Sequence, residues 1–352
     1  MTELQLTLTP QEASEETELK KVAAKNLNIS FNDITHLQIV KKSIDARGRQ
    51  PLVLLKLRVF INEEPIYTYE NEIHYQNVSN RKPVIVIGSG PAGLFGALRL
   101  IELGLCPIIL ERGKDVSERK KDIAQLNRNT AFNSESNYCF GEGGAGTFSD
   151  GKLYTRSNKR GNPQRIFEIF HRHGAQNEIL YEAHPHIGTD RLPIVIKNIR
   201  QTILDCGGKI YFNSKVIEFL LDGNQIQGVK TEDGTIYKSN NVILATGHSA
   251  RNIYNLLHKQ KIQLEAKGFA MGVRVEHSQG LINSIQYHSP IQNPFLPAAN
   301  YNLVQQINGR GVYSFCMCPG GHIVPSATEP EQIVVNGMSA SHRNSPFANS
   351  GI

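Results

Sequence analysis

The chain of 352 residues is long enough for two or three domains, and its 39% hydrophobic and 20% charged residues are typical of a globular protein. Its net charge of +6 would suit anionic partners, but the basic residues are dispersed, so we expect no nucleic-acid partner. The polar start does not resemble a signal peptide, and no apolar window is long enough to span a membrane. The five cysteines contain no CxxC repeat and do not suggest a disulfide framework. These features indicate a cytoplasmic protein.

Residues 1–78 are predicted to form a small α/β domain. Alternating apolar residues predict strands in LQLTL, HLQIVKKSIDARGR and LVLLKLRVFI, and SEETELKKVAAKN predicts a helix capped by Ser14. Sheets of this size can bind RNA, but the aromatic pair that stacks bases is missing. We therefore favour a packing or docking domain.

A strand, turn, helix and second strand follow at the start of a second predicted domain, residues 82–262, with an insertion around 156–190. The apolar run Val84–Ile87 predicts a strand buried on both faces, LFGALRLIELG a helix, and PIIL the next strand. The intervening turn reads GSGPAG, with glycines at the spacing GxGxxG. This order and a length of about 30 residues indicate a βαβ unit.

Each glycine of this turn has a separate mechanical task. Gly88 permits the sharp turn, Gly90 lets the backbone approach a pyrophosphate, and Gly93 lets the helix pack against the strand. Amides of the first helical turn then face the anion. Glu111 lies 18 residues after Gly93, where a carboxylate can accept hydrogen bonds from ribose hydroxyls, with Arg112 beside it. The predicted dinucleotide site comprises Gly88, Ser89, Gly90, Pro91, Ala92, Gly93, Glu111 and Arg112.

The first motif alone does not choose between NAD and FAD. Residues 207–247 predict successive strands separated by Asp-Gly turns, and they end in VILATG. In this respect the chain resembles the two-domain flavoproteins of the glutathione-reductase type. The resemblance implies a Rossmann-like FAD/NAD(P)-binding α/β fold, with Ala245, Thr246 and Gly247 near FAD. It also implies that the glycine-rich stretch CFGEGGAGTFSDGKLYT contacts the cofactor through Gly143, Gly144, Ala145, Gly146 and Thr147. A flexible surface loop is the alternative for that stretch.

Five further strings give a narrower resemblance: KKSIDARGR, GGAGTFSDGKL, HPHIGTDRLP, CMCPGGHIVPS and MSASHRNSPFANSG. Together they look like the uncharacterised bacterial FAD-dependent dehydrogenases with an extra N-terminal domain. That resemblance implies that residues 263–352 form a mixed α+β substrate or cap domain, incomplete at its C-terminus. Such chains continue into a Gly-Asp segment that contacts the flavin, and this sequence ends at SPFANSGI.

Three residues are weak candidates for catalysis. Lys152 would stabilise a reduced, anionic flavin, or it would be a solvated loop lysine, with Asp150 as its partner or as a turn former. Cys316 and Cys318 lie two residues apart, and a regular strand would point both thiols to one face, either as a redox pair or as buried free cysteines.

His184 and His186 lack further ligands nearby in the sequence, so we expect no metal. They precede the predicted helix LPIVIKNIRQTILDC, with Thr189 or Asp190 as its cap.

The sequence therefore predicts an FAD-dependent oxidoreductase, a dehydrogenase of an unknown small molecule, with NAD(P)H as a possible electron donor. Two alternatives stay open: an FAD-dependent enzyme that modifies tRNA, and a non-catalytic FAD-binding protein.

Overall fold

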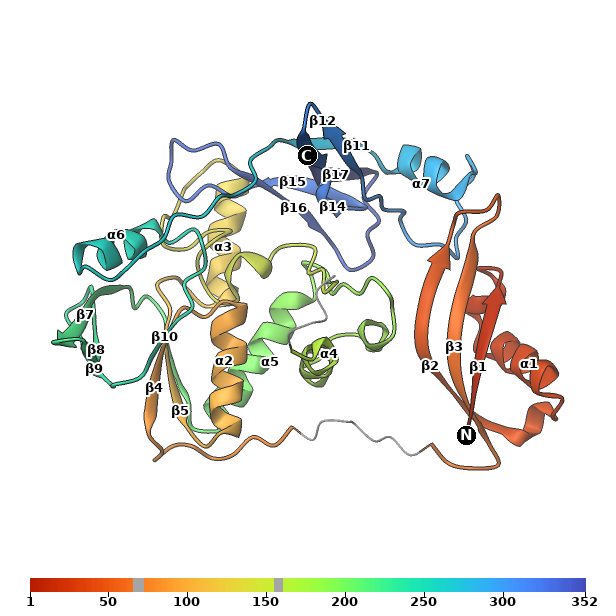
Figure 1. Cartoon of the computed structure of the whole chain (residues 1–352), viewed down its shortest axis with the longest axis horizontal. Helices are drawn as coiled ribbons and strands as arrows, with labels where there is room; N and C mark the ends of the chain where they lie inside the picture. The colour runs from red at the N-terminus through yellow and green to blue at the C-terminus, as the bar shows by residue number, and fades with distance from the viewer. Residues whose placement is uncertain (66–72, 155–160) are drawn as a thin grey trace.

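The structure is a computed structural model that describes residues 1–65, 73–154 and 161–352. Figure 1 shows three groups of elements: N-terminal strands with α1 beside them, a parallel sheet with α2 and α5 beside it, and short strands from the last third of the chain. Within the described ranges, every helix is too short or too polar to cross a membrane. Residues 66–72 of the predicted first domain and 156–160 of the predicted insertion lie outside the described residues.

The N-terminal unit is an antiparallel sheet in the order β1-β3-β2, covered by one helix. Its elements are β1 (Thr2–Leu8), η1 (Glu12–Ser14), α1 (Glu16–Leu27), η2 (Phe31–Asp33), β2 (Ile34–Asp45) and β3 (Leu52–Ile61). The three predicted strands and the helix are confirmed. The predicted cap is wrong, because Glu15 precedes α1 and the Ser14 hydroxyl donates to the Gln11 carbonyl at 2.7 Å. Ser14 instead closes the preceding 3-10 turn.

The edge strand β2 joins this unit to the rest of the molecule. The Lys42 amide donates to the Tyr181 carbonyl at 2.9 Å, and the Ala183 amide donates to the Lys42 carbonyl at 2.9 Å. Residues 181–183 thus run beside β2 as a short parallel extension of the sheet. Backbone hydrogen bonds therefore hold the N-terminal unit in place and cover part of an otherwise open edge.

A four-stranded parallel sheet, in the order β10-β4-β5-β6, forms the centre of the molecule. Its strands are β4 (Pro83–Ile87), β5 (Cys106–Leu110), β6 (Lys209–Tyr211) and β10 (Val242–Leu244). Val84 and Val86 of β4 pack in one core cluster with α2 (Pro91–Glu102), whereas Ile85 and Ile87 pack in another. Because successive side chains of a strand point to opposite faces, both faces of β4 are covered, as the sequence predicts.

Several helices follow β5 along the chain and precede β6. They are α3 (Val116–Asn127), η3 (Gly144–Gly146), α4 (Pro163–Arg172), η4 (Asn177–Leu180) and α5 (Leu192–Asp205). The predicted helix α5 is confirmed, but its predicted cap is wrong: Arg191 occupies the cap position without a side-chain bond. Asp190 instead accepts hydrogen bonds from the Ser341 amide and hydroxyl, both at 2.7 Å, so it ties this segment to the C-terminal region.

An antiparallel meander covers the second face of the sheet. It consists of β7 (Val216–Asp222), β8 (Gln225–Thr231) and β9 (Ile236–Lys238), and the helix α6 (Arg251–Lys259) follows β10. Phe219, Val229 and Ile253 bury their side chains with Ile85 and Ile87. The meander returns the chain to β10, which pairs with β4 in parallel. The predicted strand in KIYFN is β6, which joins the parallel sheet and not the meander.

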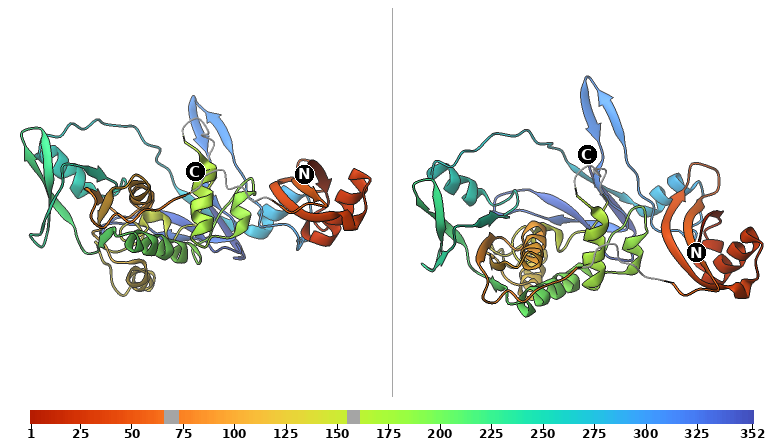
Figure 2. Two further views of the ribbon diagram at one scale, coloured as in Figure 1. Left: turned by 90° about the horizontal axis from the view of Figure 1, so that it is seen from below. Right: turned by 60° about the horizontal axis from the view of Figure 1, so that its bottom comes forward.

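The last third of the chain forms small antiparallel sheets. Their elements are β11 (Arg274–Ser278), α7 (Gln279–Tyr287), β12 (Val304–Ile307), β13 (Arg310–Tyr313), β14 (Phe315–Cys318), β15 (Gly321–Pro325), β16 (Val335–Ser339) and β17 (Phe347–Gly351). The sheet β11-β17-β14 is the largest of them, with β17 between the other two strands. Both views in Figure 2 show the β12–β13 hairpin standing away from the body of the molecule.

Candidate functional site

Contacts within the chain require two glycines of the loop between β4 and α2. Gly88 has a φ of +103°, and a Cβ added there would lie 2.5 Å from the Ala245 carbonyl oxygen. A Cβ added to Gly93 would lie 1.9 Å from the Gly88 carbonyl oxygen. A side chain at either position would therefore collide with the backbone, in agreement with the tight turn and close helix packing predicted from the sequence.

No contact within the chain requires Gly90, the third glycine. Its φ of −70° is accessible to any residue, and a Cβ added there would meet only the Gly144 Cα, at 3.7 Å. Gly90 caps α2, with Pro91 at the first helical position, so the free amides of the first turn point outward beside it. The missing side chain thus leaves space for a ligand at the helix N-terminus.

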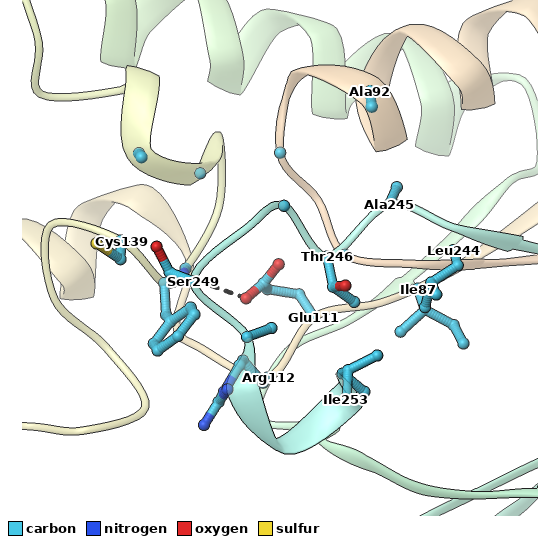
Figure 3. A pocket seen from close by; sticks show the side chains of 18 of the residues that line it. Ile87, Ala92, Glu111, Arg112, Cys139, Leu244, Ala245, Thr246, Ser249 and Ile253 are labelled. Carbon is cyan, nitrogen blue, oxygen red and sulfur yellow. Dashed lines mark hydrogen bonds between the residues drawn. The ribbon is translucent and has the colours of Figure 1, made fainter. Parts of the chain in front are cut away.

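A cavity of about 450 Å³ opens at this point, in the range of about 300–1,000 Å³ usual for small-molecule sites. It lies where the chain leaves the carboxyl ends of β4, β5 and β10 (Figure 3), the edge at which parallel sheets bind ligands. The sequence-predicted residues that line it are Gly88, Gly90, Pro91, Ala92, Glu111, Arg112, Gly144, Ala145, Gly146, Ala245, Thr246 and Gly247. Folding therefore brings four separate segments of the predicted site to one cavity.

Four predicted residues, Ser89, Gly93, Gly143 and Thr147, do not line the cavity. Gly143 has a φ of +80°, and its amide donates to the Ser89 carbonyl at 2.9 Å. The Thr147 hydroxyl donates to the carbonyl of Glu142 at 2.9 Å. These hydrogen bonds hold the two glycine-rich loops in place from outside the cavity lining.

Glu111 lies in the cavity wall, yet both of its carboxylate oxygens are engaged within the chain. One oxygen accepts from the Ser89 amide and hydroxyl, both at 2.8 Å. The other accepts from the amides of Gly113 and Gly141, at 2.9 and 3.1 Å. Four donors match the roughly four acceptor positions of a carboxylate. In the structure Glu111 therefore ties the two loops together, and its contact with a ribose stays a prediction.

Arg119, which no sequence motif singled out, shapes the second glycine-rich loop, residues 141–147. Its fully buried guanidinium donates to the carbonyls of Asn137 at 2.8 Å, Tyr138 at 3.0 Å and Glu142 at 2.6 Å. Burial lowers the pKa of Arg119 to about 10, so it stays cationic at neutral pH. Because the Arg119 side chain donates to these carbonyls, it holds the loop in place where no neighbouring strand among the described residues does so. The sequence feature that could have identified Arg119 is its spacing, three residues after Val116, which places both residues on the buried face of α3.

The Glu142 side chain is buried beneath the same loop. The Val116 amide donates to its carboxylate at 2.7 Å, and Arg200 lies 3.1 Å from the same oxygen. Its other oxygen is buried and has no hydrogen-bond partner among the described residues. Burial raises the pKa of Glu142 to about 7 despite these partners. The loop therefore carries a carboxyl group that titrates near neutral pH.

The end of the cavity near α6 contains the predicted Arg112 and further residues that were not predicted. Arg112 donates to Glu135 at 2.6 Å and to Asn252 at 2.8 Å, and it lies over the Phe140 ring. Lys215, Ser214, Val216, Asn252 and Ile253 complete this end. No motif marks them, because they belong to the start of the meander and to α6, which reach the cavity only through the tertiary fold.

The weak catalytic candidates Lys152, Cys316 and Cys318 do not line this cavity. They lie together elsewhere, with the Lys152 Nζ 3.7 Å from the Cys318 Sγ and 3.7 Å from Asp150. Asp150 is the partner of Lys152 and also pairs with Arg343 through two hydrogen bonds.

His184 and His186 are held by contacts within the chain. The His184 ring lies 4.5 Å from the Tyr154 ring, and the His186 Nε2 lies 2.9 Å from the Ser341 carbonyl oxygen. Burial lowers the pKa of both histidines. In the parts of the chain that the structure describes, no group of three His, Cys, Asp or Glu side chains is arranged to bind a metal.

The fold and cavity thus define an α/β protein with a parallel sheet and a glycine-lined crevice at its carboxyl edge. Residues 268–352 match the family described as "FAD-dependent protein, C-terminal domain-like", and residues 1–60 match a "Domain of unknown function (DUF8436)". An uncharacterized protein of Clostridium beijerinckii is 39% identical over 351 residues, which cover 95% of this chain and 66% of the relative. The chain therefore spans just under two thirds of the length of that relative.

Solved structures give distant matches to parts of the chain. L-proline dehydrogenase from P. horikoshii matches with 14% identity and a TM-score of 0.37, over 56% of this chain and 59% of that chain. Glycine oxidase from Bacillus cereus matches with 16% identity and a TM-score of 0.33, over 52% and 59%. The tetracycline destructase Tet(51) matches with 13% identity and a TM-score of 0.35, over 77% and 57%.

Proposed function

We propose that the protein is an FAD-dependent oxidoreductase whose substrate is a small molecule not yet identified. The observation that carries this proposal is the bare backbone at Gly90 and Gly144. A Cβ added to Gly144 would lie 3.0 Å from the Gly90 Cα, so the two loops face each other without side chains at the start of α2. The match of residues 268–352 to an FAD-dependent family supports the same cofactor.

The residues of the cavity fit the adenosine and pyrophosphate half of FAD. The first-turn amides of α2 and its dipole would hold the pyrophosphate, in the space that a side chain on Gly90 would fill. At the end near α6 the cavity is lined by Arg112 and Lys215, which both pair with Glu135, at 2.6 and 3.0 Å. Glu111 and Arg119 keep the two loops in place through hydrogen bonds made entirely within the chain. When bound, FAD would supply the hydride and electron transfer.

The visible spectrum of the purified protein tests this proposal. We expect the flavin absorbance either as purified or after incubation with FAD, and we expect NADH or NADPH to bleach it in the absence of oxygen. Protein that stays colourless after incubation with FAD would refute flavin binding by this chain. Bound flavin that no reductant bleaches would instead favour the non-catalytic alternative. RNA that co-purifies and dissociates steeply with salt would favour the tRNA-modifying alternative.

A further inference from the structure

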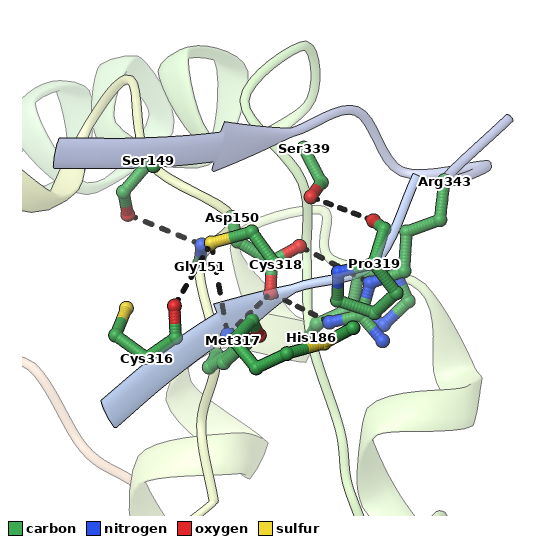
Figure 4. A network of polar contacts seen from close by, with 12 residues as sticks. Ser149, Asp150, Gly151, His186, Cys316, Met317, Cys318, Pro319, Ser339 and Arg343 are labelled. Carbon is green, nitrogen blue, oxygen red and sulfur yellow. Dashed lines mark hydrogen bonds and ion pairs between the residues drawn. The ribbon is translucent and has the colours of Figure 1, made fainter. Parts of the chain in front are cut away.

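We propose that Cys316 and Cys318 form a redox-active thiol pair, in which Cys316 attacks a low-molecular-weight disulfide and Cys318 completes an intramolecular disulfide. The proposal does not depend on the flavin. It concerns a cluster outside the cavity described above, where the two cysteines lie beside Asp150 and Arg343 (Figure 4).

An irregularity in β14 changes the backbone at the two cysteines. Phe315 pairs with Gly351 and Cys318 pairs with Asn349, so three steps along β14 oppose two steps along β17. Such a bulge breaks the alternation of a regular strand. Cys316 has a φ of +51°, a conformation uncommon for a residue with a side chain. The Cys318 thiol donates to the Cys316 carbonyl at 3.4 Å, and neither cysteine is in a disulfide. The expectation of a regular strand at this point is therefore wrong.

Cations flank the pair from two different elements. The Lys152 Nζ lies 3.7 Å from the Cys318 Sγ and also donates to the Met317 carbonyl. Arg274 of β11 donates to the Cys316 carbonyl at 3.3 Å. Asp150, the nearby anion, is bound by Arg343 at 2.6 and 3.1 Å, which leaves the charge of Lys152 less neutralised. The thiol pair therefore lies in an electropositive environment, the kind that stabilises a thiolate.

The two cysteines differ in exposure and in pKa, which assigns one as the attacking thiol and the other as the thiol that completes the disulfide. Cys316 is partly exposed, whereas Cys318 is fully buried. The neighbouring Cys318, with Lys152 and Arg274, lowers the pKa of Cys316. The neighbouring Cys316 and burial raise the pKa of Cys318. Cys316 is therefore the accessible thiolate, and Cys318 is the protonated inner thiol.

The chemistry follows from these roles. The Cys316 thiolate attacks one sulfur of a disulfide RSSR, so a mixed disulfide forms and one thiolate RS⁻ leaves. The Cys318 thiol then loses its proton to the released thiolate, and its sulfur attacks the Cys316 sulfur. The Cys316–Cys318 bond forms and the second RS⁻ leaves, taking a proton from solvent. In sum, two protein thiols are oxidised to one disulfide while RSSR is reduced to two RSH.

The absence of a side chain at Gly337 lets other side chains pack closely there, because an added Cβ would lie 2.2 Å from the Asn349 Oδ1 and 2.4 Å from the Arg274 guanidinium. A Cβ added at Gly337 would lie 2.9 Å from the Cys318 Sγ. Among the other thiols, burial raises the pKa of both Cys106 and Cys206. Cys206 is also partly exposed, which makes it the matched control for reactivity.

The test uses the full chain and oxidised glutathione, with N-ethylmaleimide added to block the remaining thiols before proteolysis and mass spectrometry. We expect the peptide that contains both cysteines to become lighter by two hydrogen atoms. In Cys318→Ser, or in Cys318→Ala if the first variant is unstable by circular dichroism, we expect a glutathione adduct on Cys316 that persists. In Cys316→Ser we expect no reaction at Cys318, and Cys206→Ser should behave as the unaltered chain.

The pH dependence separates an activated thiol from a merely exposed one. Because the pKa of Cys316 is lowered, we expect the rate at Cys316 to change little between about pH 6 and 8. An ordinary thiol reacts about tenfold faster per pH unit over that range. Lys152→Met should restore part of that slope. A wild-type chain that keeps five free thiols, or adducts that form equally on Cys206, would overturn the proposal.

Discussion

Replacing Gly90 by valine should abolish cofactor binding and leave the fold intact. A Cβ at this position meets no atom of the chain closer than 3.7 Å, and the φ of −70° suits any residue. Because valine caps a helix less well than glycine, we expect the free energy of unfolding to fall by about 1 kcal/mol. The valine methyl groups would fill the space proposed for the pyrophosphate.

The loss of affinity follows from the hydrogen bonds at the start of α2. Displacing a pyrophosphate from two amides removes two hydrogen bonds to a charged group, each of about 1.5–3 kcal/mol. The loss of at least about 3 kcal/mol corresponds to a Kd more than about 100-fold higher. Equilibrium dialysis with FAD measures the affinity, and urea unfolding measures the stability.

Gly96→Ala in the interior of α2 is the matched control for this experiment. A Cβ there meets nothing within 4 Å, so we expect unchanged affinity and a gain of about 0.5–1 kcal/mol in stability. FAD bound by Gly90→Val with the original Kd would refute the assignment of this loop to the pyrophosphate. Unfolding of that variant at much lower urea would refute the claim that the chain itself leaves Gly90 free.

Three further variants test the supporting network. Glu111→Gln turns an amide nitrogen toward backbone donors, so we expect the free energy of unfolding to fall by about 1–3 kcal/mol in urea titration; a change in FAD affinity alone would contradict the bracing role. Arg119→Met removes a donor from four buried carbonyls, and we expect a loss of about 3–5 kcal/mol, compared with Arg128→Met at the exposed end of α3; equal stability of the two variants would be the contrary result. The third variant, Glu142→Gln, tests pH dependence: the folded-state pKa of about 7 lies above the ordinary value of 4.5, so this group's stabilising contribution is present below about pH 4.5 and is lost as the pH rises through 7. Urea unfolding between these pH values should show a decline in the wild type that flattens in the variant, and parallel curves would refute the assignment.

Local patterns predicted most of the elements near the site, because their residues interact mainly with near neighbours. The buried strand Val84–Ile87, the tight turn at Gly88 and the close packing at Gly93 follow from short-range sterics. Helix caps were predicted less well. Ser14 and Asp190 have the right chemistry for caps, but one closes an earlier turn and the other binds Ser341, 151 residues away.

By itself, the sequence determined that a strand, a glycine turn and a helix would present free amides at one point, since backbone sterics and helix geometry need no distant partner. Only the tertiary structure decided what surrounds that point. Glu111 connects two loops and Arg119 is a buried donor to four carbonyls, while Lys152 lies next to Cys318, 166 residues further along the chain. The partners of such side chains depend on which groups the fold brings close and on which buried polar groups need a hydrogen bond. The local spacing of residues in the sequence predicts neither.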